Sequence, residues 1–135
     1  MYKIIILFFT LLLIGCVNTG MFLAANETNV ELREANYNIV AANVTGESTA
    51  GYLIGFSYPI GAATSTLALV RVSGTGMLYR EAIENLWQNY SEHYGEIKGR
   101  KLALVNVRYD VDTINLFVYT QARVSIRADV VEFTD

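Results

Sequence analysis

The chain has very few residues of several types: one cysteine, one proline and one histidine among 135 residues. A single cysteine excludes an intrachain disulfide and a zinc site built from several cysteines. Charged residues make up only 17% of the chain, the net charge is −3 and no basic run occurs, which argues against a nucleic-acid partner. Apolar residues make up 53%, so a chain of this length can bury a real core as one domain.

The amino-terminal region has the pattern of a secretory signal. Lys3 precedes an apolar run from Ile4 to Ile14 in which only Thr10 is polar. This run is too short to span a bilayer, which takes about 20 residues, but it suits the apolar part of a signal peptide, which has roughly 7–15. We therefore expect the chain to be exported.

The apolar run ends in LIGC, which resembles the lipobox of bacterial lipoproteins: an aliphatic residue, a small residue and then cysteine. The resemblance implies cleavage before Cys16 and acylation of that cysteine, with more than one acyl chain because a single chain binds membranes only marginally. The alternative is that Cys16 is a buried thiol behind an ordinary signal or an uncleaved anchor. The predicted organisation is a signal peptide at 1–15, an acylated anchor and tether at 16–28, and one domain at 29–135.

An amphipathic helix is predicted over 77–94. Apolar residues recur there at spacings of three and four: Leu78, Ala82, Ile83, Leu86, Trp87, Tyr90 and Tyr94. The remaining positions are mostly charged or amide side chains, which predicts a solvated face. We expect Thr75 or Ser73 to cap the start of the helix and Gly95 to adopt a positive φ just past its end.

Strands are predicted on both sides of this helix. The segment 37–44 is apolar on both faces, as expected of a central strand or of a strand with a bulge. A turn at 46–48 and a second strand at 50–57 follow. The segment 67–72 fits either a strand or a helical turn.

After the helix, a strand at 101–109, a turn at 110–113 and a returning strand at 114–119 are predicted. From Ala122 to Val130 apolar residues alternate with polar ones, which predicts a half-buried antiparallel strand. The predicted fold class is α+β, with a mostly antiparallel sheet packed against one amphipathic helix.

Five segments other than the lipobox carry a resemblance to known proteins: TNVELREANYNIV, VTGESTAGYLIGFSYPIG, LALVNVRYD, INLFVY and VSIRADVVEF. Together, over about 29–133, they resemble a family of small bacterial envelope lipoproteins of unknown function, found mainly in Bacteroidetes-type bacteria. The resemblance implies an envelope location. It assigns a role to no residue other than Cys16.

No arrangement typical of catalysis or metal binding stands out. His93 has no nucleophile and orienting acid at a recognisable spacing, so a surface residue near the end of the helix is the simpler interpretation. Asp110 and Asp112 offer oxygen ligands, but the glycine and the distal glutamate of a calcium loop are missing, which favours a hairpin turn. We expect a protein that is not an enzyme and that uses no metal or cofactor.

Two further sites are predicted. Asp112-Thr113-Ile114 resembles the O-glycosylation signal of Bacteroidetes-type bacteria, and a turn at 110–113 would expose Thr113. Tyr52, Phe56 and Tyr58 could line a ligand groove with the helix aromatics Trp87, Tyr90 and Tyr94, because aromatic faces suit sugars and partner chains, although the helix aromatics also fit the core.

The sequence therefore predicts a lipid-anchored envelope lipoprotein that binds a protein partner or assembles with itself. Its partners would be the membrane, through acylated Cys16, and an envelope protein or a second copy of the chain. Val17 stands where an aspartate retains lipoproteins in the inner membrane of enteric bacteria, which favours the outer membrane. The alternative is a periplasmic or surface module that binds a ligand or glycan through a tyrosine-rich surface.

Overall fold

The computed structural model describes residues 32, 36–60, 63–116 and 118–134. Cys16, the predicted signal peptide and the predicted tether lie outside the described residues. The elements follow the order β1 (Tyr37–Ile60), β2 (Ala63–Ser73), α2 (Leu78–Tyr94), β3 (Leu102–Leu116) and β4 (Tyr119–Phe133).

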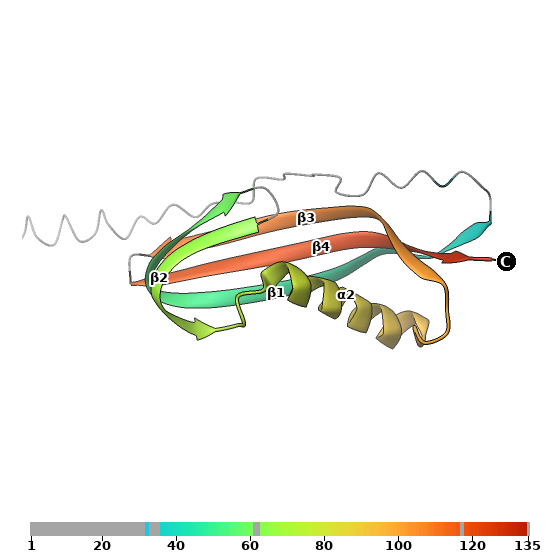
Figure 1. The fold of residues 1–135 in the computed structure, drawn as a ribbon, viewed down its shortest axis with the longest axis horizontal. Helices are drawn as coiled ribbons and strands as arrows, with labels where there is room; N and C mark the ends of the chain where they lie inside the picture. The colour runs from blue at the N-terminus through green and yellow to red at the C-terminus, as the bar shows by residue number, and fades with distance from the viewer. Residues whose placement is uncertain (1–31, 33–35, 61–62, 117, 135) are drawn as a thin grey trace, which may run out of the picture.

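The four strands form one antiparallel sheet in the order β2-β1-β4-β3, with α2 against β1 and β4 (Figure 1). β1 is central because its first part, up to Leu53, pairs with β4, whereas its last part, from Gly51, pairs with β2. The predicted α+β class is confirmed, and α2 fills nearly all of the predicted 77–94. The ambiguous segment 67–72 is part of the strand β2.

The core lies between α2 and the side of the sheet that faces it. On the helix, Leu78, Ala82, Leu86 and Tyr90 are buried, as the apolar periodicity predicts. On β4, every second residue from Ala122 to Val130 is buried, which confirms the predicted alternation. Neither Thr75 nor Ser73 is the N-cap residue as expected: Met77 holds that position without a side-chain cap, and its N–H donates to the Thr75 hydroxyl at 3.2 Å. Gly95 has the predicted positive φ, 99°.

The turn predicted at 46–48 is wrong, because β1 continues through it. Gly46 instead permits the close approach of α2. A Cβ atom at this position would lie 2.1 Å from the carbonyl oxygen of Ala82 and 2.4 Å from the backbone nitrogen of Leu86. The glycine therefore marks a contact between strand and helix, and the two predicted strands at 37–44 and 50–57 are one element.

The turn predicted at 110–113 is also wrong. β3 continues to Leu116, and Asp110 and Asp112 pair with Ser125 and Arg123 of β4. These aspartates occupy the polar face of an alternating strand, and Thr113 lies on the buried face with only 6% of its surface exposed. The expected exposure of Thr113 for O-glycosylation is therefore wrong.

Two bulges flank Asp129 on β4. Asn43 of β1 and Asn106 of β3 have φ values of 56° and 53°, and the strand register shifts at both places. The Asp129 carboxylate accepts hydrogen bonds from the Asn43 N–H and from Asn106 Nδ2, each at 2.8 Å. These bonds, that from Asn106 above all, lower the pKa of Asp129 below its usual value. Of the alternatives for 37–44, the structure confirms the bulge, whereas this stretch pairs only with β4 and is not central.

β1 bends at Ile54 into a hairpin arm, which we define as residues 54–60 of β1 together with β2. Ile54 has a φ of 49°, a conformation that a β-branched residue rarely adopts and that costs about 1–3 kcal/mol. Its N–H donates to the carbonyl oxygen of Val118 at 2.9 Å, just where the pairing of β1 with β4 ends. This hydrogen bond fixes the corner at which the arm leaves the sheet.

The arm crosses the same face of the sheet as α2. Thr120 Oγ1 donates to the Gly55 carbonyl oxygen at 2.6 Å, and the Asn115 side chain bonds both backbone groups of Ser57 at 2.8 Å. Alternation along the strands places Asn115 and Thr120 on the face of the buried Thr113. The helix and the arm therefore cover the two ends of one face, as Figure 1 shows.

We predict that Gly46→Ala lowers the free energy of unfolding by about 1–3 kcal/mol, because the new Cβ forces α2 away from β1. Urea denaturation followed by circular dichroism measures this change. Thr45→Ser, at an exposed neighbouring position, is the matched control and should leave the midpoint nearly unchanged. Equal midpoints for Gly46→Ala and the wild type would contradict the close contact.

We also predict that Asp129 makes stability depend on acid pH. Because its pKa is lower in the folded chain than in the unfolded chain, its contribution is present above the unfolded value of about 3.9 and is lost as the pH falls through the folded value. Urea midpoints measured from neutral pH downward should therefore fall less steeply for Asp129→Asn than for the wild type. Parallel pH profiles of the two proteins would show that the Asp129 bonds add no such stability.

Candidate functional site

The candidate catalytic and metal-binding residues are not brought together. His93 Nδ1 lies 2.8 Å from the carbonyl oxygen of Asn89, one turn back on its own helix. Within 36–60, 63–116 and 118–134, no group of three or more histidine, cysteine, aspartate or glutamate side chains could hold a metal ion. No helix in this part of the chain is long and apolar enough to cross a membrane.

The sheet face opposite α2 is charged. Three arginines and three acidic residues line a depression of about 280 Å³: Arg108, Arg123, Arg127, Glu47, Asp110 and Asp112. Arg123 forms an ion pair with Glu47, whereas Arg108 and Arg127 lie directly opposite each other. Charges of both signs alternate over this exposed surface, which is typical of the solvated face of an antiparallel sheet.

The strands differ more clearly in how their edges are covered than in the residues that they place on this charged face. Before Gly51, β1 pairs only with β4, so its other edge is open. Asn85 and Asn89 of α2 close that edge by donating their side-chain amides to the carbonyl oxygens of Glu47 and Thr45, at 2.7 and 2.8 Å. The sequence predicted that these two amides lie on the solvated face of the helix. Their spacing of four residues, which places them on one side of the helix, was the only signal of a shared partner.

The helix start is tied to the same strand. Ser48 Oγ donates a hydrogen bond to the Glu81 carboxylate, which also accepts one from the Thr75 N–H at 3.3 Å. These bonds, that from Ser48 first, lower the pKa of Glu81 below its usual value. Like the two asparagines, Glu81 is a polar residue of α2 that helps to hold the helix against β1 by hydrogen bonding.

The outer edge of β3 is protected against pairing with another strand. It carries Arg108, Asp110 and Asp112, and the bulge at Asn106 interrupts its regular hydrogen-bonding geometry. Charged side chains and bulges are the devices by which natural sheets blunt their edges.

Among the residues that the structure describes, none protects the outer edge of β2 in this way. Arg71 is the only charged residue of this strand, and most of the side chains from 67 to 72 are apolar and exposed. Leu67 is 80% exposed and Leu69 is 75% exposed. An exposed apolar edge strand is an unusual feature, because it offers both main-chain partners and apolar surface to another chain.

The arm also presents an apolar outer face. Across the arm Phe56 pairs with Leu67, and large apolar side chains alternate with the smaller, more buried Gly55 and Ser57. The exposed set lines or adjoins a shallow groove of about 720 Å³ and consists of Ile54, Phe56, Tyr58, Leu67 and Leu69. We call these five side chains the apolar arm face.

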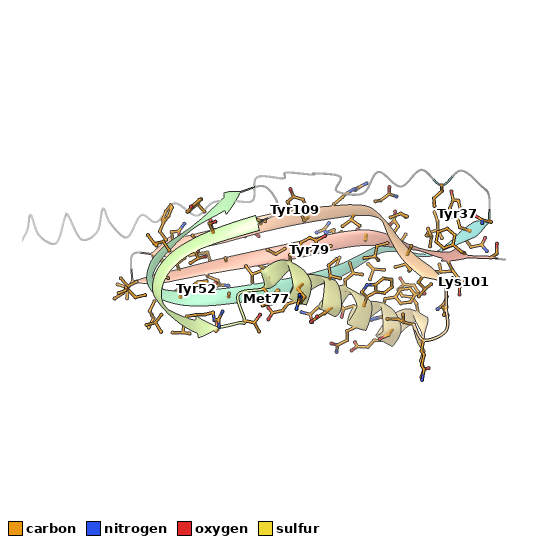
Figure 2. The ribbon with its side chains drawn as sticks, viewed as in Figure 1. Tyr37, Tyr52, Met77, Tyr79, Lys101 and Tyr109 are labelled. Carbon is orange, nitrogen blue, oxygen red and sulfur yellow. The ribbon has the colours of Figure 1, made fainter. Side chains whose placement is uncertain are left out.

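The three aromatic residues predicted to line a groove are separated. Phe56 and Tyr58 stack with their ring centroids 6.1 Å apart and are both exposed on the apolar arm face. Tyr52, labelled in Figure 2, is partly buried and packs against the core. The positive φ of Ile54 turns the chain between them, which the alternation of the sequence could not reveal.

One end of the described domain carries almost no charge. No charged residue occurs at 48–70 or at 113–122, the two stretches that form most of the arm and the reversal from β3 to β4. Near that reversal Ile114, Leu116 and Val118 are also exposed, at 45%, 46% and 65%. Large exposed apolar surfaces of this kind mark sites of interaction with proteins or membranes.

The whole chain, residues 1–135, matches the model of a family of unknown function, DUF6567. The chain therefore belongs to this family, which confirms the expectation of a family without an assigned function. No curated protein and no solved structure matches the chain.

Proposed function

We propose that this member of the family is a lipid-anchored lipoprotein of the bacterial cell envelope that binds another protein and is not an enzyme. Acylated Cys16 would hold it to the membrane. The next residue is Val17 rather than an aspartate, which favours the outer membrane. The described domain would supply the binding surface. The charged face and the helix would remain in contact with water.

The exposure of the apolar arm face is the observation that carries this proposal. Each of its five side chains is between 44% and 80% exposed. Such a surface is costly to leave in water, at roughly 25 cal/mol per Å² of apolar area, so a partner that covers it gains binding free energy. The strained corner at Ile54 aims this surface away from the core.

The shape of the groove favours a protein over a small molecule. Ligand pockets are usually deep, with a few polar groups converging on the ligand. Here the groove is shallow, and its polar side chain, Asn115, is already bonded to Ser57. Binding of a glycan by the stacked Phe56 and Tyr58 is the second candidate, because exposed aromatic faces suit sugar rings.

The anchor is tested by the intact mass of the protein extracted from bacterial membranes. We expect a chain that begins at Cys16 and carries acyl groups, and we expect Cys16→Ala to lose both the cleavage and the acylation. Asn18→Ala is the matched control and should remain acylated. A full-length mass, or a cleaved chain without acyl groups, would contradict the lipoprotein assignment.

The binding surface is tested by a photo-crosslinking amino acid placed at Leu67 or, as a control, at Glu84 on the exposed side of α2. Irradiation of intact cells should yield a discrete protein adduct from position 67 and none from position 84. Addition of soluble glycans should leave the adduct unchanged. Adducts with lipid only, or equal adducts from both positions, would contradict a protein-binding arm.

A further inference from the structure

Within the described residues, the open stretches of strand edge are treated differently. α2 covers the open stretch of β1 through Asn85 and Asn89, and charges and a bulge protect the edge of β3. At the other end of the strand order, β2 receives neither form of protection from the part of the chain that the structure describes. This contrast identifies the edge of β2 as the place where a further strand can be added.

An added protein strand suits this edge better than a lipid surface does. A lipid bilayer would cover the side chains of Leu67 and Leu69 but would leave the N–H and C=O groups of the strand edge without partners. A strand from a protein supplies hydrogen bonds to the main chain and apolar side chains to the surface at the same time. The occupant is therefore a β-strand.

The sequence of β2 suits pairing with itself. In an antiparallel pair of two β2 strands centred on Ala68, Leu67 lies opposite Leu69 of the partner subunit, and the reverse contact occurs across the two-fold axis. Arg71 then lies opposite Ser65 of the partner subunit, so the only charge of the strand avoids its own copy. No acidic residue occurs anywhere in the arm, so no other charge opposes the contact.

We infer that the protein forms a symmetric dimer in which two β2 strands pair antiparallel about Ala68 and join two four-stranded sheets into one. This inference rests on the proposed protein-binding role of the arm and names its partner as a second copy of the chain. Four leucines, two from each copy, meet on one face of the new pair, beside Phe56 of each subunit. The pairing supplies main-chain partners to the β2 edge and brings Leu67 and Leu69 of the two copies into lateral contact.

The first test uses a cysteine at the two-fold axis. In the full chain carrying Cys16→Ala, Ala68→Cys is the only thiol. Residues directly opposite in an antiparallel pair have Cα atoms about 4.5–5.5 Å apart, within the range of about 4.4–6.8 Å that a disulfide needs. Mild oxidation in mild detergent should give a covalent dimer on non-reducing electrophoresis. Val72→Cys in the same background should not, because its two copies would lie about 27 Å apart along the strands.

The second test removes the apolar seam. Leu67→Glu with Leu69→Glu should weaken dimerisation in analytical ultracentrifugation about a hundredfold or more, because four leucines in contact become four carboxylates. Val118→Glu, at a residue that is 65% exposed and lies outside β2, is the matched control and should leave the dimer intact. Circular dichroism verifies that each variant is folded.

A monomeric chain at all concentrations, or a dimer that neither crosslinks through Ala68→Cys nor responds to the leucine substitutions, would overturn the inference. A purified monomer whose position 67 still crosslinks to a different envelope protein would refute self-pairing and leave the proposed function standing. Both tests are made in the Cys16→Ala chain, which carries no acyl group, so failure of the lipoprotein assignment is seen separately in the mass measurement.

Discussion

The N–H and C=O groups along the edges of a sheet need partners, and this requirement governs the arrangement of the whole chain. The first part of β1 has β4 on one side only, and the side-chain amides of Asn85 and Asn89 supply what a fifth strand would otherwise supply. Because α2 must lie close enough for these bonds, β1 needs Gly46, where any side chain would collide with the helix backbone. One helix thus covers a face and closes an edge.

The length of β1 sets the second constraint. Its 24 residues would extend about 80 Å at 3.3 Å each, whereas the 17 residues of α2 reach only about 25 Å. The rest of the sheet must find another cover. The bend at Ile54 brings the arm back over the same face, where Asn115 and Thr120 hold it by hydrogen bonds. The core is closed at both ends, but no described residue covers the outer side of the arm.

The distribution of charge follows from this arrangement. The polar face of the sheet, the helix and the edge of β3 carry the charged side chains, whereas the arm and the neighbouring strand ends carry only Arg71. A molecule built in this way has one end suited to water and one end suited to another protein. A lipid anchor at Cys16 would hold such molecules in one membrane, where a confined search favours encounters between their apolar ends.

The sequence by itself determined the features that depend on local periodicity: the helix at α2, the alternating strand β4 and the α+β class. Such patterns report which side of an element faces the core, and that is fixed along the element itself. The sequence could not show that Gly46 and Asp110 lie within strands. Glycine and aspartate are common in turns, and the sequence alone does not distinguish those uses from close packing or a place on a polar face. It grouped Tyr52 with Phe56 and Tyr58, which the corner at Ile54 separates. Only the tertiary structure decided which edge is covered and which is open, because edge pairing joins residues that are far apart in the chain.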